Sequence, residues 1–315
     1  MHIALIGSEV DPQIIHIANA LRASHASFFI ANTEYFGTGW SISYDPDFND
    51  GLIHFDHAEI GNDMGDLPRV TFSAIHACYW HEYRAGAVEN SASDDSSKTS
   101  EYQWTEQERS STLLCWFSYE DIKWVNPIEA IRSYQCKPVQ LKIAGKLGAN
   151  IPYSFVGNAT EVAAQFCSNM REIIYKPTRG GQTAQFVNKQ LNMRPLLQAL
   201  LQQRPVMFQK YIAGTHIRSF VLGDEVVSVR IESNELDYRN DKRAQITATV
   251  IPKDVQQLAI ELCKALGMHW CAIDWRKSAK NTFFFLEANP SPFFLTIEKD
   301  TGQDITGRLI TLLTS

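Results

Sequence analysis

Short apolar runs alternate with amphipathic segments along the whole chain. The first run, residues 1–7, predicts a strand, and Asp11 with Pro12 then predicts the capped start of a helix. That helix has an apolar stripe made of Ile14, Ala18 and Leu21. A second apolar run at residues 27–31 completes a predicted β-α-β unit, and residues 36–55 predict short extended pieces and loops.

From residue 126 onward, the pattern predicts a mixture of helices and strands. Helices are expected at about 126–134, 141–147, 160–170, 193–202 and 255–266. Strands are expected at 153–156, 173–176, 184–187, 206–212, 216–222, 226–231, 246–250, 269–275 and 282–288. Many of the later strands follow one another through short turns, which favours antiparallel pairs. The predicted fold class is α+β, and no G-x-G-x-x-G motif follows the first strand to indicate a dinucleotide site.

The segment from about residue 85 to 104 differs from its surroundings. Residues 89–100 are polar, small and acidic, with almost no side chain that could be buried. Such a composition predicts a mobile loop within the first part of the chain. Simple disorder is the favoured interpretation, and a functional lid is the alternative.

Composition narrows the class of protein further. The chain has 315 residues, a net charge of −6 and 44% hydrophobic residues, which is typical of a globular enzyme. It has no basic stripe for nucleic acid and no apolar run of the roughly 20 residues that span a membrane. The six cysteines form no C-x-x-C pair and the first residues do not resemble a signal peptide, so a cytoplasmic location is expected.

The most informative motif lies at residues 283–292, FFFLEANPSP. Because residues two apart share a face of a strand, Glu287 and Asn289 are expected to present oxygens side by side. Asp274, which ends another apolar run, can add a third oxygen. Such hard oxygen ligands suit Mg²⁺ bound together with substrate phosphates. The alternative is an ordinary strand that runs into an Asn-Pro turn.

Two further segments have the chemistry of a phosphate site. Lys176 ends a predicted strand just before Gly180 and Gly181, whose backbone N–H groups could face a phosphate. Residues 206–218, VMFQKYIAGTHIR, combine an apolar strand, a Gly-containing turn and Arg218. An ordinary hairpin explains each segment equally well when it is taken alone.

The order of these segments resembles the ATP-grasp superfamily of carboxylate–amine ligases. The resemblance extends from about residue 126 onward, and three stretches carry it: WVNPIEAIRSYQCKPVQLKIAGKLGANIP, FQKYIAGTHIRSFVLG, and AIDW with the later FFFLEANPSPFFLTIEKDTG. Within the superfamily the chain is most similar to ribosomal-protein glutamate ligases, glutathione synthetase-like enzymes and microviridin-type peptide-maturing ligases. The last segment, IEKDTG, resembles the peptide-maturing group.

The resemblance implies a role for each matched residue. Lys137 and Lys176 would contact the phosphates of ATP together with the loop at Gly180 and Gly181, and Arg218 would face the same phosphates. Arg218 and Lys176 are thus the expected catalytic residues. The adenine would be held by the hinge Gln209, Lys210, Tyr211 and Ile212, and Mg²⁺ by Asp274, Glu287 and Asn289.

Two positions depart from the pattern of the family. Lys210 stands where many relatives have Glu, and His216 lies where an acidic residue often meets the ribose. These departures leave the details of nucleoside binding open. In the charged segment 235–243, Arg239 is a candidate for binding a substrate carboxylate, as is Arg230 on the preceding strand, although charged runs are usually only solvated.

The resemblance implies an ATP-dependent ligase that activates a carboxylate as an acyl phosphate and joins it to an amine or hydroxyl group. A peptide or amino-acid substrate is expected. A small-molecule dipeptide or glutathione-like ligase is the alternative, and a non-catalytic nucleotide-binding regulator is a third hypothesis. Three lobes are expected, at residues 1–124, 125–204 and 205–315, with ATP between the last two. A homodimer is retained as a possible assembly, with no nucleic-acid or membrane partner.

Overall fold

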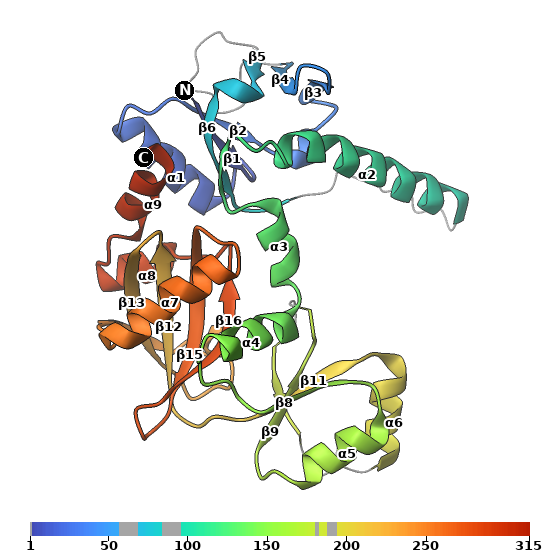
Figure 1. The fold of residues 1–315 in the computed structure, drawn as a ribbon, viewed down its shortest axis with the longest axis vertical. Helices are drawn as coiled ribbons and strands as arrows, with labels where there is room; N and C mark the ends of the chain where they lie inside the picture. Colours follow the sequence, from blue (N-terminus) through green and yellow to red (C-terminus); the bar gives the residue numbers. More distant parts are fainter. Residues whose placement is uncertain (1, 57–68, 84–95, 180–182, 188–193) are drawn as a thin grey trace. The chain divides into compact units, whose positions relative to one another are not determined.

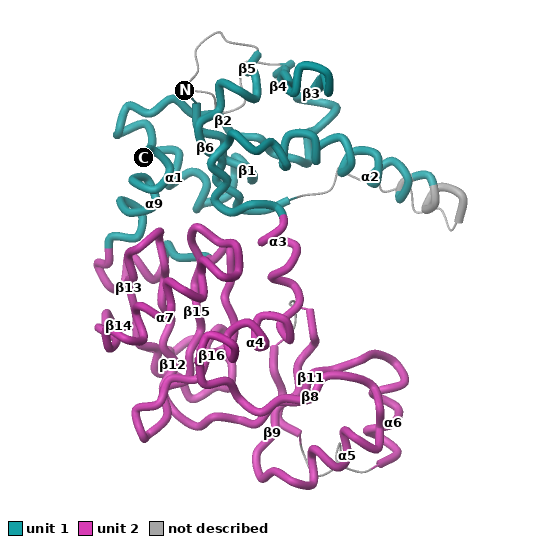
Figure 2. The backbone as a smooth tube through the Cα atoms, viewed as in Figure 1, with its two compact units in different colours: residues 1–128, 293–295, 304–315 teal, residues 129–292, 296–303 magenta. Residues whose placement is uncertain are grey.

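The computed structural model describes residues 2–56, 69–83, 96–179, 183–187 and 194–315. The chain divides into two compact units (Figures 1 and 2). Unit 1 contains residues 1–128, 293–295 and 304–315, and unit 2 contains residues 129–292 and 296–303. The expected division into three lobes stays a prediction.

Unit 1 is built on a parallel sheet with the strand order β2-β1-β6-β7. The strands are β1 (His2–Ile6), β2 (Phe28–Ala31), β6 (Ile75–Trp80) and β7 (Lys123–Val125). Helix α1 (Pro12–Ala23) connects β1 to β2, which confirms the predicted β-α-β opening, and Asp11 caps it by accepting hydrogen bonds from the N–H groups of Gln13 and Ile14. Helix α9 (Ile305–Thr314) packs against α1 and β6.

A second, antiparallel sheet in unit 1 has the order β3-β4-β5. Its strands are β3 (Trp40–Asp45), β4 (Asp50–Phe55) and β5 (Arg69–Thr71). Helix α2 (Ser96–Phe117) follows, and its Trp116 is fully buried among the rings of Phe29, Trp40, Phe72 and Trp124. An aromatic cluster therefore joins the parallel sheet, the antiparallel sheet and α2.

Helix α2 corrects the sequence-based prediction of a loop up to residue 104. Residues 96–104 are helical, and residues 84–95 lie outside the described part of the chain. The physical reason lies further along the helix, where Leu113 and Trp116 are fully buried and Arg109 donates hydrogen bonds to the carbonyls of Thr33 and Glu34. Packing of this end stabilises the helix, and good helix formers such as Glu101 and Gln103 extend it through a polar stretch.

Unit 2 contains two antiparallel sheets. The small sheet has the order β10-β9-β11-β8, with β8 (Ser154–Gly157), β9 (Ile173–Lys176), β10 (Gln185–Phe186) and β11 (Val206–Lys210). Helices α5 (Thr160–Ser168) and α6 (Arg194–Gln203) pack against each other, and their buried side chains share one core with β9 and β11. These strands and helices lie close to the predicted positions.

The large sheet has the order β14-β13-β12-β15-β16. Its strands are β12 (Thr215–Leu222), β13 (Glu225–Glu232), β14 (Gln245–Thr249), β15 (Trp270–Lys277) and β16 (Phe283–Asn289), and every pair is antiparallel. The structure thus confirms the α+β class with many antiparallel pairs late in the chain.

The two faces of the large sheet differ in chemistry. One face, which includes Ile217, Val221, Ile273 and Trp275, forms an apolar core with helix α7 (Lys253–Ala265) (Figure 1). Helix α7 contributes Val255, Ala259 and Leu262 at the spacing of an amphipathic helix, and α4 (Lys137–Lys146) adds Leu141 and Ala144. The opposite face, which we call the polar face, carries the charged side chains Arg218, Asp274 and Arg276 beside buried apolar ones such as Phe220 and Val229.

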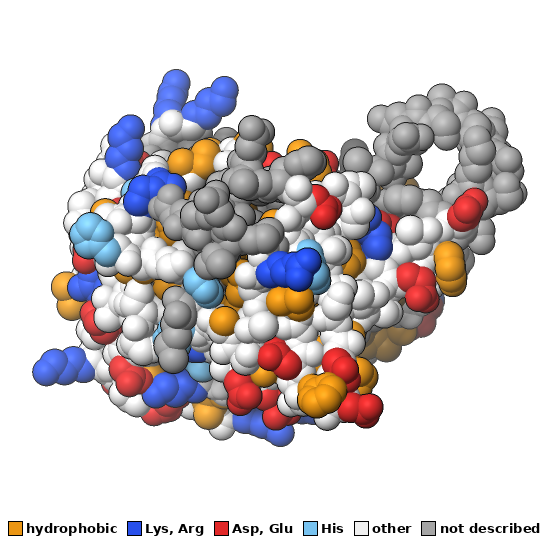
Figure 3. Space-filling model, turned by 90° about the horizontal axis from the view of Figure 1, so that it is seen from above, with side chains coloured by type: hydrophobic (Ala, Val, Ile, Leu, Met, Phe, Trp, Pro, Cys, Tyr) orange, Lys and Arg blue, Asp and Glu red, His pale blue; other side chains and the backbone are white. Residues whose placement is uncertain are grey.

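The remaining helices are α3 (Ile128–Tyr134) and α8 (Leu295–Thr301). No helix in the described residues is both long enough and apolar enough to cross a membrane. On the surface shown in Figure 3, basic and acidic side chains are interspersed and apolar side chains are scattered among them.

Candidate active site

Three charged side chains form a row across neighbouring strands of the large sheet. Arg218 on β12 pairs in register with Asp274 on β15, and Asp274 pairs with Glu287 on β16. Residues opposite one another in adjacent strands point to the same face, so the three side chains lie side by side. They lie on the face opposite the apolar core, and we call them the Arg218–Asp274–Glu287 row.

A β-bulge in β16 decides which face Glu287 uses. Asp274 is opposite Glu287, but the next residue, Trp275, is opposite Phe285, so Leu286 is an extra residue. Phe285 is fully buried in the apolar core. Without the extra residue, the alternation of a strand would turn Glu287 to the same side as Phe285. The bulge therefore allows β16 to be apolar on one side and still place its carboxylate beside Asp274.

Arg218 is held in place by two partners. Its Nη1 donates to both Asp274 oxygens, at 2.9 and 3.0 Å, and to the Tyr238 hydroxyl at 3.3 Å. Burial acts to lower the pKa of the guanidinium, but the Asp274 carboxylate and Tyr238 outweigh it and raise the pKa overall. Arg218 is therefore a fixed positive charge that points along the polar face.

Two lysines approach the same carboxylates from other elements of unit 2. Lys137, the first residue of α4, forms an ion pair with Glu287 Oε2. Lys176 ends β9 of the small sheet, and burial lowers its pKa to about 8 although the charges of Glu287 and Asp274 oppose this. Burial alone would raise the pKa of Glu287, but the charges of Lys137 and Lys176 lower it overall, so Glu287 is ionised at neutral pH.

The donor set of Asp274, Glu287 and Asn289 fits Mg²⁺. The pKa of the Asp274 carboxyl is raised by burial and by the neighbouring Glu287 charge, although Arg218 opposes this, so a cation between the two carboxylates would relieve their repulsion. Asn289 lies opposite Ala272, one same-face step beyond this pair, and its Oδ1 accepts a hydrogen bond from Ser291 N at 3.0 Å. In the described residues, no group of three or more His, Cys, Asp or Glu side chains could hold a metal by itself. Nucleotide phosphates and water would therefore have to complete the coordination.

The predicted hinge joins the two sheets of unit 2. Gln209 is buried, and its amide donates to the Ser154 hydroxyl at 2.9 Å. Backbone N–H groups of Lys210 and Tyr211 donate to the carbonyls of Tyr153 and Glu172. The Lys210 side chain is exposed, and Tyr211 and Ile212 are half-buried. Hydrogen bonds therefore fix the backbone at the start of the hinge, whereas the side chains of its last residues are partly exposed to solvent.

His216 lies one same-face step from Arg218 along β12. Its ring packs edge to face on Tyr238 at 5.6 Å between ring centroids. Burial, with the Arg276 charge as the next cause, lowers the pKa of His216 to about 4, so the ring is neutral at physiological pH. Its Nε2 is buried and makes no hydrogen bond with the described residues. This buried nitrogen can therefore make one hydrogen bond with a ligand, as acceptor or as donor according to the tautomer of the neutral ring.

The two arginines proposed for the substrate lie in different places. Arg239 pairs with Asp237, its Nε donating to Oδ1 at 2.8 Å, and its charge acts on both Asp274 and Glu287. Arg230 lies opposite Ile217 on the other side of the large sheet, is exposed, and pairs with Glu232. The structure thus brings Arg239 to the row but not Arg230. Gly180 and Gly181 lie outside the described residues.

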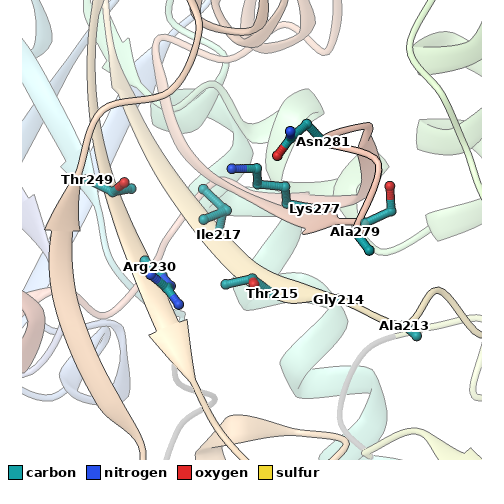
Figure 4. A pocket seen from close by; sticks show the side chains of 10 residues that line it. Ala213, Gly214, Thr215, Ile217, Arg230, Thr249, Lys277, Ala279 and Asn281 are labelled. Atoms are coloured by element: carbon teal, nitrogen blue, oxygen red, sulfur yellow. The ribbon is translucent and has the colours of Figure 1, made fainter.

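Arg230 lines a pocket of about 510 Å³ at the start of β12 and the end of β15 (Figure 4). Gly214, Thr215, Lys277 and Asn281 also line this pocket. Because Ile217 is both a lining residue and part of the apolar core, the pocket opens on the side of the sheet away from the Arg218–Asp274–Glu287 row.

Several residues of the site could not be found from the sequence. The pKa of Tyr134 is raised by its burial and by the charges of Glu287 and Asp274, which places it beside the row. Tyr238 contacts Arg218, and Gln140 holds the backbone of Ala288 between Glu287 and Asn289 on β16. Tyr and Gln are common in cores and on surfaces, so only the position of Gln140 one turn after Lys137 gives any signal.

The chain is similar to known proteins in sequence and in structure. The RimK-like ATP-grasp domain model matches residues 140–313. A protein of Haemophilus ducreyi named "Probable alpha-L-glutamate ligase" is 30% identical over 214 residues, which cover 64% of this chain and 69% of that protein. A protein of the same name from Haemophilus influenzae is 28% identical over 196 residues, which cover 59% and 65% of the two chains.

Solved structures resemble the chain along its whole length. The ATP-grasp ligase PsnB, complexed with a minimal precursor, has a TM-score of 0.83 at 22% identity and covers 99% of this chain and 97% of its own. The macrocyclase MdnC from Microcystis aeruginosa, bound with the precursor peptide MdnA, has the same TM-score and identity and full coverage of both chains. These similarities establish the ATP-grasp fold. Because the family model covers more than half of the sequence, the chain belongs to the RimK-like ATP-grasp family.

Proposed function

We propose that this ATP-grasp ligase activates a carboxylate as an acyl phosphate at the Arg218–Asp274–Glu287 row and then joins it to an amine or a hydroxyl group. The observation that carries the proposal is the row itself, with Lys137 and Lys176 at its Glu287 end. Phosphoryl transfer requires mainly positioning and charge neutralisation, and this cluster of cations and carboxylates offers both.

Each residue of the cluster then has a role. Lys137, Lys176 and Arg218 would neutralise the phosphates of ATP, and the hinge from Gln209 to Ile212 would hold the adenine, with the His216 ring near the ribose. Asp274, Glu287 and Asn289 would hold Mg²⁺, which supplies charge neutralisation at the phosphate oxygens when bound. In the structure, two of these cations pair with the carboxylates, Arg218 with Asp274 and Lys137 with Glu287. Binding of nucleotide and Mg²⁺ would exchange these partners and leave few buried charges uncompensated.

The substrate carboxylate would bind near Arg239. A peptide is the favoured substrate. The support is that PsnB and MdnC, which share the fold along the whole chain, are described with precursor peptides. A free amino acid such as glutamate is the second candidate, because the matched Haemophilus proteins carry the name of glutamate ligases. A cytoplasmic location, a homodimer and the position of ATP between a central and a C-terminal lobe accompany this proposal as expectations.

Hydroxylamine trapping tests the chemistry directly. Wild-type protein is incubated with Mg²⁺-ATP, hydroxylamine and either a glutamate-containing peptide or free L-glutamate. A hydroxamate should form together with ADP, and it should not require the natural amine or hydroxyl acceptor. Release of AMP in place of ADP would contradict the acyl phosphate. A hydroxamate on the peptide but not on glutamate would assign the substrate class.

The variants Glu287→Gln and Asn289→Ala serve as matched tests of the site. Both side chains lie on the polar face, so the apolar core of the large sheet is left intact. Loss of a metal ligand weakens stabilisation of the transferring phosphoryl group by several kcal/mol, so hydroxamate formation should fall by about 100-fold or more. Full ATP consumption by either variant would place the metal elsewhere.

A further inference from the structure

Arg276 is a buried arginine that the roles above do not use. It lies on β15 two residues beyond Asp274, and only 7% of its surface is exposed. In the described part of the chain, no carboxylate forms an ion pair with it. A buried charge without a counter-charge is costly, so its remaining contacts must be specific.

Those contacts join three separate segments. Arg276 Nη1 donates to the carbonyl of Gly214 at 3.0 Å, and Nη2 donates to the carbonyl of Leu236 at 3.3 Å. The guanidinium also lies over the ring of Tyr211, 5.7 Å from its centroid. Tyr211 belongs to the hinge, Gly214 to the turn that follows it, and Leu236 to the loop between β13 and β14.

The loop of residues 233–244, which we call the β13–β14 loop, carries side chains that reach the row. Its Tyr238 accepts a hydrogen bond from Arg218, and the charge of its Arg239 acts on Asp274 and Glu287. Asp241 organises the loop internally by accepting from the Ser233 hydroxyl at 2.8 Å and from Asn234 N at 3.0 Å. Leu236 is thus the point at which Arg276 attaches this loop to the sheet and to the hinge.

We propose that Arg276 is a positioning residue that couples nucleotide binding at the hinge to the conformation of the β13–β14 loop. The inference rests on the proposed function, because it takes residues 209–212 as the adenine site. A nucleotide that orders Tyr211 would fix the guanidinium lying over it, and the guanidinium would in turn fix Leu236. Tyr238 and Arg239 would then be held in place for the carboxylate. Such coupling is reciprocal, so a ligand bound at the loop would tighten nucleotide binding by the same factor.

Hydrogen–deuterium exchange tests this coupling with a non-hydrolysable ATP analogue, AMPPNP, and Mg²⁺. In the wild-type protein the nucleotide should slow exchange in residues 209–212 and also in residues 233–244, the latter by about fivefold or more. In Arg276→Gln, the nucleotide should still protect the hinge, but the protection of the β13–β14 loop should be lost. Arg276→Lys keeps a charge that can reach one carbonyl at a time, so it should restore part of the effect.

Arg194→Gln is the matched control, because Arg194 is an exposed arginine of α6 that pairs with Glu161 in the same unit. It should leave the nucleotide-dependent protection of the loop unchanged. Unaltered protection of the loop in Arg276→Gln would overturn the proposal, as would loss of nucleotide binding in both Arg276 variants, which would make Arg276 part of the nucleotide site itself. Absence of any nucleotide effect at the wild-type hinge would instead refute the proposed function.

Discussion

At the scale of single residues, the Gln140 side chain makes the backbone hydrogen bonds that a neighbouring strand would otherwise make with β16. Strand β16 lies at the edge of the large sheet, and the Gln140 amide donates to the carbonyl of Ala288 at 3.0 Å and accepts from its N–H at 2.7 Å. The same amide also donates to the carbonyl of Tyr134 at 3.1 Å. Gln140 thus fixes the backbone between Glu287 and Asn289, and only 1% of its surface is exposed.

We expect Gln140→Leu to destabilise the fold by about 2–6 kcal/mol. The leucine would leave the N–H and C=O groups of Ala288 buried without their partners, and each such group costs about 1–3 kcal/mol. Urea denaturation measures the change. Gln257→Leu, at an exposed position of α7, should change stability by no more than about 0.5 kcal/mol. Equal effects of the two substitutions would contradict the role of Gln140.

Lys176 gives a prediction about pH. Burial lowers its pKa from the usual 10.5 to about 8. Between these values the unfolded chain binds more protons, so this group makes folding more favourable as pH rises. A bound phosphate would favour the charged form of Lys176. When Mg²⁺-AMPPNP binds at pH 9, Lys176 should therefore take up about one proton from solution. At pH 7 Lys176 is already mostly protonated and should take up almost none.

Calorimetry in buffers of different ionisation enthalpy measures this uptake. Lys176→Arg is the control, because an arginine stays charged throughout this range and should remove the pH dependence. The prediction fails if wild-type uptake is the same at both pH values, or if the arginine variant still takes up the proton at pH 9.

The sequence could predict the residues of the row but not their neighbours. Arg218, Asp274 and Glu287 stand in an order and spacing that the family resemblance identifies. Tyr238 and Arg276 act through contacts between segments distant in the chain, and neither their residue type nor their spacing distinguishes them from surface residues. For Arg230 the sequence does not show which face of β13 the side chain uses, and in the structure it lies on the side of the large sheet away from the row.

At the scale of elements, the hydrophobic periodicity predicted which residues form strands, but it did not predict which face of the sheet each side chain uses. Strand β9 occupies the predicted residues 173–176, because its apolar run has clear limits. The bulge at Leu286 could not be predicted, since the run FFFLEAN is equally compatible with regular alternation. Register across β15 and β16 is a property of the assembled sheet, and it determines the direction of Glu287.

The turn between the two sheets of unit 2 is sensitive to substitution at Gly214. Its φ angle is +151°, and a Cβ at this position would lie 2.1 Å from the carbonyl oxygen of Lys277. We therefore expect Gly214→Ala to displace the turn from the end of β15, with a loss of about 1–3 kcal/mol of stability and weaker nucleotide binding. Thermal unfolding and AMPPNP titration measure the two effects.

Gly148→Ala provides the comparison. Gly148 also has a positive φ of +84°, but a Cβ there would meet nothing within 4 Å. Only the backbone strain remains, about 1 kcal/mol, and nucleotide binding should be unaffected. Equal losses of stability and of AMPPNP affinity in the two alanine variants would show that the close approach of residue 214 to the carbonyl oxygen of Lys277 has no effect.

At the scale of the whole molecule, neither unit is continuous in sequence. Unit 1 takes up residues 293–295 and 304–315 after the chain has formed most of unit 2. In helix α9, Ile305, Leu309 and Leu313 are fully buried. Three such side chains contribute on the order of 5–9 kcal/mol, so removal of residues 304–315 should unfold unit 1.

Differential scanning calorimetry tests this truncation. We expect the transition of unit 1 to be lost, while Mg²⁺-AMPPNP still raises the unfolding temperature of unit 2, since every proposed nucleotide contact lies there. An unchanged first transition would show that α9 is dispensable for unit 1. Loss of the nucleotide effect would show that the two units do not unfold independently.

The anchoring of residues 293–295 has a consequence for biosynthesis. Gln13, fully buried in unit 1, accepts a hydrogen bond from Phe294 N at 2.9 Å and donates to the Tyr79 hydroxyl at 3.1 Å. During translation at about 5–20 residues per second, Gln13 emerges from the ribosome well before Phe294. For roughly 14 to 56 seconds the hydrogen bond between Phe294 N and the Gln13 side chain therefore cannot form. The unit whose synthesis begins first is the one whose folding is completed last, and a ribosome stalled before residue 294 should carry a protease-sensitive N-terminal unit.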